Sequence, residues 1–91
     1  MKYEIIVTSK FKKDIKLMKK QGKDMEKMWQ IIKKLADGEM LDERYRDHSL
    51  TGNFSGYREC HIAPDWLLVY KINNSELLLL LARTGSHSEL F

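Results

Sequence analysis

The spacing of the apolar residues changes once along this chain, and that change restricts the folds it can adopt. Between residues 9 and 36, apolar side chains recur with the period of an α-helix, first around residues 11–18 and again around residues 25–35. Gly22 lies between the two stretches and can adopt the left-handed conformation in which many helices end. Residues 9–36 are therefore predicted to form a helical hairpin.

Polar residues stand where each predicted helix begins. Thr8 or Ser9 can cap the first helix and Asp24 the second, because a side-chain oxygen there accepts a hydrogen bond from the first turn. Asp37-Gly38 ends the second helix. The apolar stripe of this helix is expected in the core and consists of Met25, Met28, Trp29, Ile32 and Leu35.

Beyond residue 56 the pattern indicates three strands joined by short turns. The predicted strands are residues 57–62, 66–72 and 75–83. Ala63-Pro64-Asp65 forms the first turn, and Asn73-Asn74 the second, because asparagine tolerates the positive φ of a tight hairpin. Three consecutive strands with short turns make an antiparallel meander.

The last of these strands is apolar at every position from 77 to 81, so both its faces should be covered and it should lie inside the sheet. Residues 2–7 predict another short strand beside it, in a direction that periodicity leaves open. We therefore expect one α+β domain over residues 1–91. An N-terminal strand would precede a two-helix hairpin packed on a four-stranded, mainly antiparallel sheet.

Positive charge is concentrated in the first half of the chain. Residues 1–46 contain 13 Lys and Arg against 8 Asp and Glu, a net +5, whereas residues 47–91 contain 3 against 5, a net −2. A basic helix face can bind the phosphate backbone of RNA without reading its sequence, and Lys12, Lys16 and Lys19 are candidates for that role. The alternative is an ordinary solvated face.

The chain has one cysteine, Cys60, which excludes an intramolecular disulfide and a paired-cysteine zinc site. A chain with a single cysteine is compatible with a reducing, cytoplasmic environment. The first residues lack a signal-peptide core, and the apolar run 77–82 is far shorter than the ~20 residues needed to cross a bilayer. We expect neither secretion nor a membrane partner.

Residues suited to proton transfer lie beside the predicted turns of the second half, where functional groups concentrate. They are His48, His61, Asp65 and His87, and Arg83, which is suited to phosphate binding, lies with them. The histidine spacings of 13 and 26 residues match no metal-binding motif, so no metal or other cofactor is expected. A serine hydrolase is also disfavoured, because no nucleophile elbow is present.

Two histidines can act as base and acid in one reaction at neutral pH. RNA supplies its own nucleophile, the 2′-OH, and a guanidinium such as that of Arg83 can hold the phosphate oxygens. Each residue taken alone also has a structural interpretation: His61 as a strand-end residue, Asp65 as a turn residue and Trp66 as a core ring. Their coincidence favours metal-independent RNA cleavage.

Three segments resemble the YafQ-type toxins of the RelE/ParE superfamily: DHSLTG at 47–52, GYRECHIAPDWLLVY at 56–70 and RTGSHSELF at 83–91. The resemblance implies a RelE-like fold and an endoribonuclease of a type II toxin–antitoxin pair. Such a toxin binds in the ribosomal A site, where it contacts ribosomal RNA and cuts messenger RNA, until a cognate antitoxin covers it. The toxin–antitoxin complex would bind operator DNA through the antitoxin.

The resemblance also implies roles for individual residues. His48, His61, Asp65 and His87 are similar to the acid–base group of these toxins, and Arg83 to their phosphate clamp. Trp66 and Phe91 resemble the positions that support the substrate or stack on it. The order of the proton transfers stays open.

Two other functions compete with this interpretation. A ParE-like toxin would inhibit a topoisomerase and cut nothing, but the histidine-rich C-terminal part argues against it. A DNA-binding module is the second, because two helices joined at Gly22 with exposed lysines could form a helix-turn-helix. Against it, the second helix uses its apolar stripe for the core and leaves only scattered lysines outside.

Overall fold

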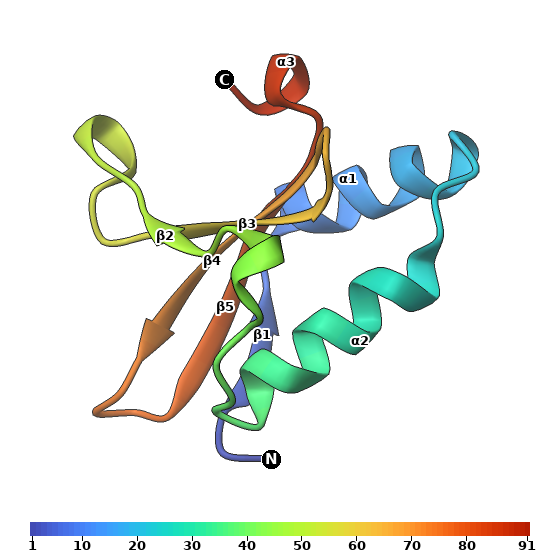
Figure 1. Ribbon diagram of the computed structural model, residues 1–91. Coiled ribbons are helices and arrows are strands. Elements are labelled where there is room, and N and C mark those ends of the chain that lie inside the picture. Colours follow the sequence, from blue (N-terminus) through green and yellow to red (C-terminus); the bar gives the residue numbers. More distant parts are fainter.

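One five-stranded sheet, with strand order β1-β5-β4-β3-β2, forms the centre of the molecule (Figure 1). The computed structural model describes residues 1–91. Its strands are β1 (Glu4–Val7), β2 (His48–Ser49), β3 (Arg58–Ala63), β4 (Trp66–Asn73) and β5 (Leu78–Gly85). Its helices are α1 (Ser9–Lys20), α2 (Met25–Ala36) and α3 (His87–Leu90), with short 3₁₀ helices η1 (Glu43–Tyr45) and η2 (Gly52–Phe54).

The sheet confirms the predicted α+β class and adds one strand to the expected four. The added strand, β2, has two residues and pairs antiparallel with β3, so it is too short to produce an alternating pattern in the sequence. β5 lies between β1 and β4, as its apolar run predicted. β1 runs parallel to β5, which answers the question of direction.

The helical hairpin is confirmed, with its predicted caps. The Thr8 hydroxyl accepts from the Phe11 backbone N–H at 3.0 Å, and the Asp24 carboxylate accepts from the Lys27 backbone N–H at 3.3 Å. Gly22 has a positive φ of 74°, which a residue with a Cβ adopts at a cost. The chain can therefore reverse between α1 and α2.

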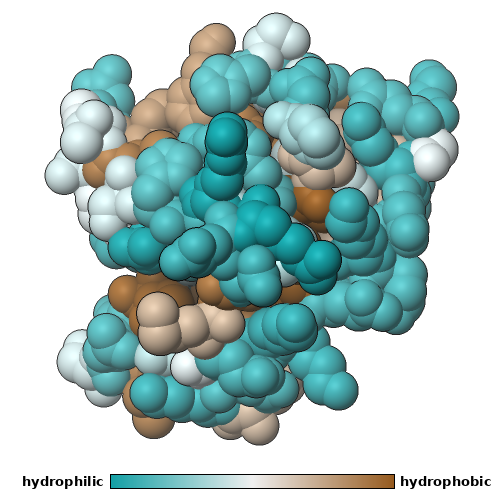
Figure 2. Space-filling view, in the orientation of Figure 1, coloured by the Kyte–Doolittle hydropathy of each residue, from teal (hydrophilic) through white to brown (hydrophobic).

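Both long helices cover the same face of the sheet and enclose the main core (Figure 1). α2 contributes Met28, Ile31, Ile32, Leu35 and Ala36. The expectation that Trp29 is buried is wrong, because its side chain flanks this stripe and is 40% exposed. Hydrophilic residues cover most of the surface in the same view, and apolar residues appear in a hollow across its lower half (Figure 2).

The turn between β4 and β5 is wider than predicted. The third strand was expected to begin at residue 75, but β5 begins at Leu78. The Asn73 side chain accepts hydrogen bonds from the Ser75 and Glu76 backbone N–H groups, each at 3.1 Å, and these bonds stabilise the turn. The positive φ, 55°, falls on Leu77 and not on an asparagine.

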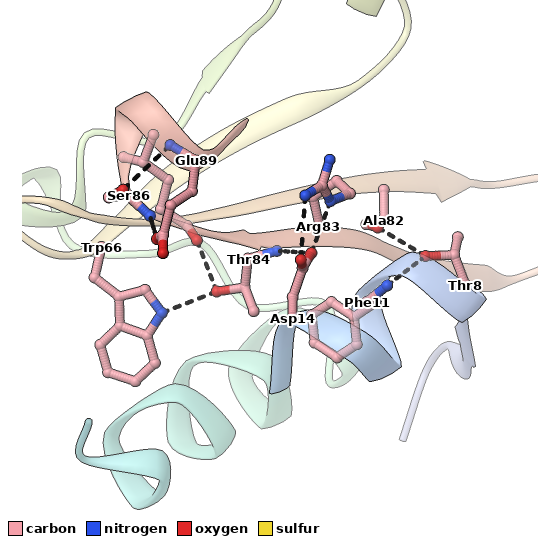
Figure 3. A network of polar contacts seen from close by, with 10 residues as sticks. Thr8, Phe11, Asp14, Trp66, Ala82, Arg83, Thr84, Ser86 and Glu89 are labelled. Atoms are coloured by element: carbon pink, nitrogen blue, oxygen red, sulfur yellow. Dashed lines mark hydrogen bonds and ion pairs between the residues drawn. The ribbon is translucent and has the colours of Figure 1, made fainter. Parts of the chain in front are cut away.

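The second half of β5 has no strand on its outer side, because β1 ends at Val7 opposite Leu81. α1 supplies the missing hydrogen-bond partners (Figure 3). The Thr8 hydroxyl donates to the Ala82 carbonyl at 2.7 Å, and the Asp14 carboxylate accepts from the Thr84 N–H at 3.1 Å. The exposed sheet edge is thereby closed beside the residues discussed below.

A smaller apolar cluster lies on the sheet face opposite the long helices and is formed by Leu67, Val69 and Leu90. Leu90 belongs to α3, so this cluster attaches the C-terminal helix to β4. None of the helices combines the length and the apolar character that crossing a membrane requires.

Candidate active site

His48 and His61 lie together on the sheet face that the long helices leave open. β2 brings them together, because His48 is the register partner of Glu59, two residues before His61 on β3. The centres of the two imidazole rings are 6.4 Å apart. His61 is the register partner of Leu67, so both belong to the face that carries the smaller apolar cluster.

The His48 ring is held in one orientation. Its Nδ1 lies 2.7 Å from the Arg46 carbonyl oxygen. A carbonyl only accepts, so Nδ1 carries the proton in this bond and the neutral ring has its lone pair on Nε2. His48 is exposed, and this nitrogen is suited to accept a proton from a substrate.

The residues on either side of His48 are both bound by Arg58. The Arg58 guanidinium donates to the Asp47 carboxylate at 3.0 Å and to the Ser49 hydroxyl at 2.8 Å. The Tyr70 hydroxyl also donates to Asp47. Burial, with a smaller contribution from Asp47, raises the pKa of Tyr70, so this phenol stays a donor. The two-residue strand β2 is therefore anchored despite its length.

His61 has a carboxylate beside it. Its Nε2 lies 3.6 Å from the Glu59 carboxylate, an ion pair when the imidazole is protonated. Glu59 is almost completely buried, at 3% exposure, whereas His61 is partly exposed. The strand pairing shifts by one residue between His61 and Ala63, and such bulges often direct a side chain beside an active site.

The C-terminal residues form a second group, built around α3. The His87 backbone N–H donates to the Asp65 carboxylate at 3.2 Å, which ties the β3–β4 turn to this helix. The His87 ring lies 5.5 Å from the ring of Phe91, which in turn meets Phe54 edge-on at 5.0 Å. Leu90 packs in the small cluster with Leu67, the register partner of His61. Both groups therefore border the same face of the sheet.

A capping box fixes the start of α3. The Ser86 hydroxyl accepts from the Glu89 N–H at 3.2 Å, and the Glu89 carboxylate accepts from the Ser86 N–H at 2.7 Å. The bond from Ser86, with a second from the Gln21 side chain, lowers the pKa of Glu89. The Ser-x-x-Glu sequence that makes a capping box was a signal for this helix that sequence reasoning missed.

Arg83 is not a free cation. Its guanidinium donates to the Asp14 carboxylate at 2.7 and 3.1 Å, from Nε and Nη2 (Figure 3). These bonds raise the pKa of Arg83 above its ordinary value, so the group is always charged. Nη1 and the second N–H of Nη2 are left without a protein hydrogen-bond partner, so a phosphate could contact Arg83 at these groups.

Asp14 was not predicted as a site residue. It is the one acidic side chain buried on α1, between Phe11 and Met18 on the apolar stripe. An aspartate in a buried stripe requires a partner, which was the signal available in the sequence.

Trp66 belongs to the core, so the stacking half of its predicted role is wrong. Its side chain is 2% exposed, and its indole N–H donates to the Thr84 hydroxyl at 2.9 Å (Figure 3). The Lys23 ammonium lies 5.9 Å from the centre of the ring. No RNA base can stack on the buried ring, so the remaining predicted role of Trp66 is to support the substrate site. Phe91, by contrast, is 50% exposed.

The basic residues of α1 lie outside the apolar stripe. Lys12, Lys16 and Lys19 are all exposed, and none of them takes part in an ion pair with an acidic side chain. No group of three His, Cys, Asp or Glu side chains converges in the geometry of a metal site. Burial raises the pKa of Cys60, so this thiol is not a nucleophile at neutral pH.

A helical hairpin covers one face of the sheet, and a pair of histidines, one exposed and one partly exposed, lies on the other. These features define a RelE-type α+β protein with a candidate acid–base site. The family model described as the bacterial toxin YafQ of a type II toxin–antitoxin system matches residues 3–91. The chain therefore belongs to the YafQ family of toxins.

Individual relatives agree with this assignment. The mRNA interferase toxin YafQ of Escherichia coli K12 is 39% identical over 89 residues, which cover 97% of this chain and 95% of the relative. A metal-bound toxin from Helicobacter pylori has a TM-score of 0.92 at 44% identity, over 98% of this chain and 99% of that one. YafQ in the E. coli DinJ–YafQ complex has a TM-score of 0.89 at 39% identity, over 98% of each chain.

Proposed function

We propose that this chain is an mRNA interferase, an endoribonuclease that cuts messenger RNA on the ribosome. The observation that carries the proposal is the pair of adjacent histidines, His48 and His61, on an open sheet face that the α3 group also borders. The E. coli relative that is 39% identical is named an mRNA interferase toxin, which supports the same activity here.

The proposed reaction is an internal transesterification. A base removes the proton of the 2′-OH, whose oxygen attacks the adjacent phosphorus. The bond to the 5′-oxygen breaks as an acid protonates that oxygen, giving a 2′,3′-cyclic phosphate and a free 5′-OH. Water and metal ions are not reactants in this step.

His48 is suited to be the base, because the free lone pair of its neutral ring is on the exposed Nε2. His61 and His87 are candidates for the acid. Arg83 contributes its free Nη1 to the charge on the phosphorane oxygens, with Asp14 holding the guanidinium in place. Asp65 contributes by binding the backbone of His87, and Phe91 offers an exposed ring for stacking.

The expected partners follow from the same assignment. The DinJ–YafQ complex of E. coli supports a cognate antitoxin, through which the complex would contact operator DNA. Lys12, Lys16 and Lys19 present charge to the backbone of ribosomal RNA, an interaction that salt should weaken. The ribosome places the protein in the cytoplasm when it acts.

Expression of the chain without an antitoxin should stop translation, with messenger RNA cut inside coding frames. DNA synthesis should continue at first. Pulse labelling of protein and DNA, with mapping of RNA ends, measures both. A ParE-like toxin would give the reverse order, and early loss of DNA synthesis with intact messenger RNA would replace our proposal.

Cleavage should proceed in EDTA, because histidines and Arg83 fill the proton and charge roles. The test uses free RNA, since EDTA also dissociates ribosomes, and the products should end in a 2′,3′-cyclic or 3′-phosphate. The Helicobacter pylori relative is described as metal-bound, so a parallel reaction with added Zn²⁺ or Cu²⁺ is included. Complete loss of cutting in EDTA, restored by one of these metals, contradicts the prediction.

A further inference from the structure

A pocket that includes His61 lies at the end of β3. It has a volume of about 490 Å³, within the range of sites that bind small ligands. Parts of α2, η1 and the end of β3 form its walls. Its lining residues are Lys27, Arg44, Tyr45, Arg46, His61, Ile62, Ala63 and Pro64.

The charge of this pocket is entirely positive. Three cationic side chains, those of Lys27, Arg44 and Arg46, line it together with His61, and no Asp or Glu does. The ion pairs of the protein involve Arg58, His61 and Arg83 only, so none of the three cations is in direct contact with a carboxylate. Clustered like charges repel one another, and an anion in the pocket would relieve that repulsion.

Arg46 has a strained backbone. Its φ of 51° and ψ of 43° are left-handed values that an arginine adopts at a cost and a glycine does not. In this conformation its carbonyl oxygen lies 2.7 Å from Nδ1 of His48, and the same residue lines the pocket. Strain of this kind concentrates at functional sites, and here one residue joins the pocket to a proposed catalytic histidine.

Arg44 also presents a flat surface. Its guanidinium lies 4.8 Å from the centre of the Tyr45 ring and donates to the Tyr45 hydroxyl at 2.8 Å. Aromatic rings and guanidinium planes are the surfaces on which single-stranded RNA bases stack. The pocket thus combines phosphate-binding cations with a stacking plane, next to His61.

We propose that this pocket binds one nucleotide of the RNA substrate next to the cleaved bond. Arg46 and Lys27 hold its phosphate, and its base stacks on Arg44. This inference rests on the proposed ribonuclease function and extends it, because it assigns substrate binding to residues outside the acid–base group.

Arg46→Gly is the most informative variant, because glycine relaxes the left-handed backbone while the cation is lost. Its melting temperature should equal or exceed that of the wild type, whereas its affinity for RNA should fall. Arg44→Gln and Lys27→Gln remove the other two charges. Lys33→Gln with Lys34→Gln is the matched control, since both lysines are exposed on α2 and outside the pocket.

The probe is a short oligoribonucleotide with 2′-O-methyl groups, which binds but cannot be cut. Each pocket variant should bind it about tenfold more weakly or worse, the scale of one lost charge-assisted contact, and the control should bind as the wild type does. In single-turnover cutting of the unmodified RNA, the half-saturating concentration should rise more than the maximal rate falls.

Wild-type binding by all three pocket variants would overturn the inference and leave the ribonuclease function intact. Loss of antitoxin binding with unchanged RNA binding would also overturn it, because the pocket would then belong to the protein partner. A wild-type protein that neither binds nor cuts RNA would overturn the proposed function and this site together.

Discussion

Replacing His87 by alanine should lower the rate of RNA cleavage by ~10²-fold or more, the usual scale for a lost acid or base. The fold should hardly change. The His87 side chain is exposed, and Phe91 is the only aromatic ring beside it, so we expect the free energy of unfolding to change by no more than about 0.5 kcal/mol. Single-turnover cutting on programmed ribosomes, beside a thermal melt, measures the two effects.

Asp65→Ala is a useful companion to His87→Ala. The Asp65 carboxylate accepts from the His87 backbone N–H, so its loss should displace α3 while every histidine stays. A moderate loss of rate is expected, and its pH profile should keep the wild-type form. If a folded His87→Ala protein cut RNA at the wild-type rate, His87 would leave the mechanism, and His48 and His61 would constitute the site.

Trp66→Ala should destabilise the protein by about 3–5 kcal/mol, the range for a large aromatic side chain removed from a core. Domains have roughly 5–15 kcal/mol of stability in total, so much of the variant would unfold near body temperature. The reason is burial: the ring is 2% exposed and its N–H is bonded to Thr84. Thermal or urea unfolding gives the change in free energy.

Trp66→Phe separates the structural role of this residue from a catalytic one. Phenylalanine keeps most of the ring and loses the bond to Thr84, for a cost of about 1 kcal/mol. Folded Trp66→Phe protein should cut RNA almost as fast as the wild type. A variant with a wild-type melting temperature and a large loss of cutting would restore Trp66 as a residue that contacts RNA.

The long, regular elements of this fold could be predicted from the sequence. Local sequence patterns suffice to predict the two amphipathic helices, their caps Thr8 and Asp24, and an apolar strand inside the sheet. The structure confirms these elements. β2 could not be predicted in this way. Its two residues are held by Arg58, whose bonds to Asp47 and Ser49 span 11 and 9 residues of sequence.

The resemblance to a known family indicated candidate site residues, but only the structure shows what these residues contact. Arg83 illustrates the difference, because its partner Asp14 is 69 residues away in the sequence and on another element. Arg46 illustrates it too. No glycine or asparagine marks this position, so the sequence does not indicate a left-handed backbone there; the hydrogen bond between the Arg46 carbonyl and His48, two residues further on, accompanies it in the structure.

The parallel pairing of β1 with β5 also sets when the protein can first act. Glu4 pairs with Leu78, 74 residues further along the chain, and the strand that completes the sheet lies almost at the C-terminus. During synthesis the emerging chain therefore lacks the central strand and α3, and with them Arg83 and His87. The proposed site can therefore assemble only after β5 and α3 have been synthesised and have joined the elements made before them.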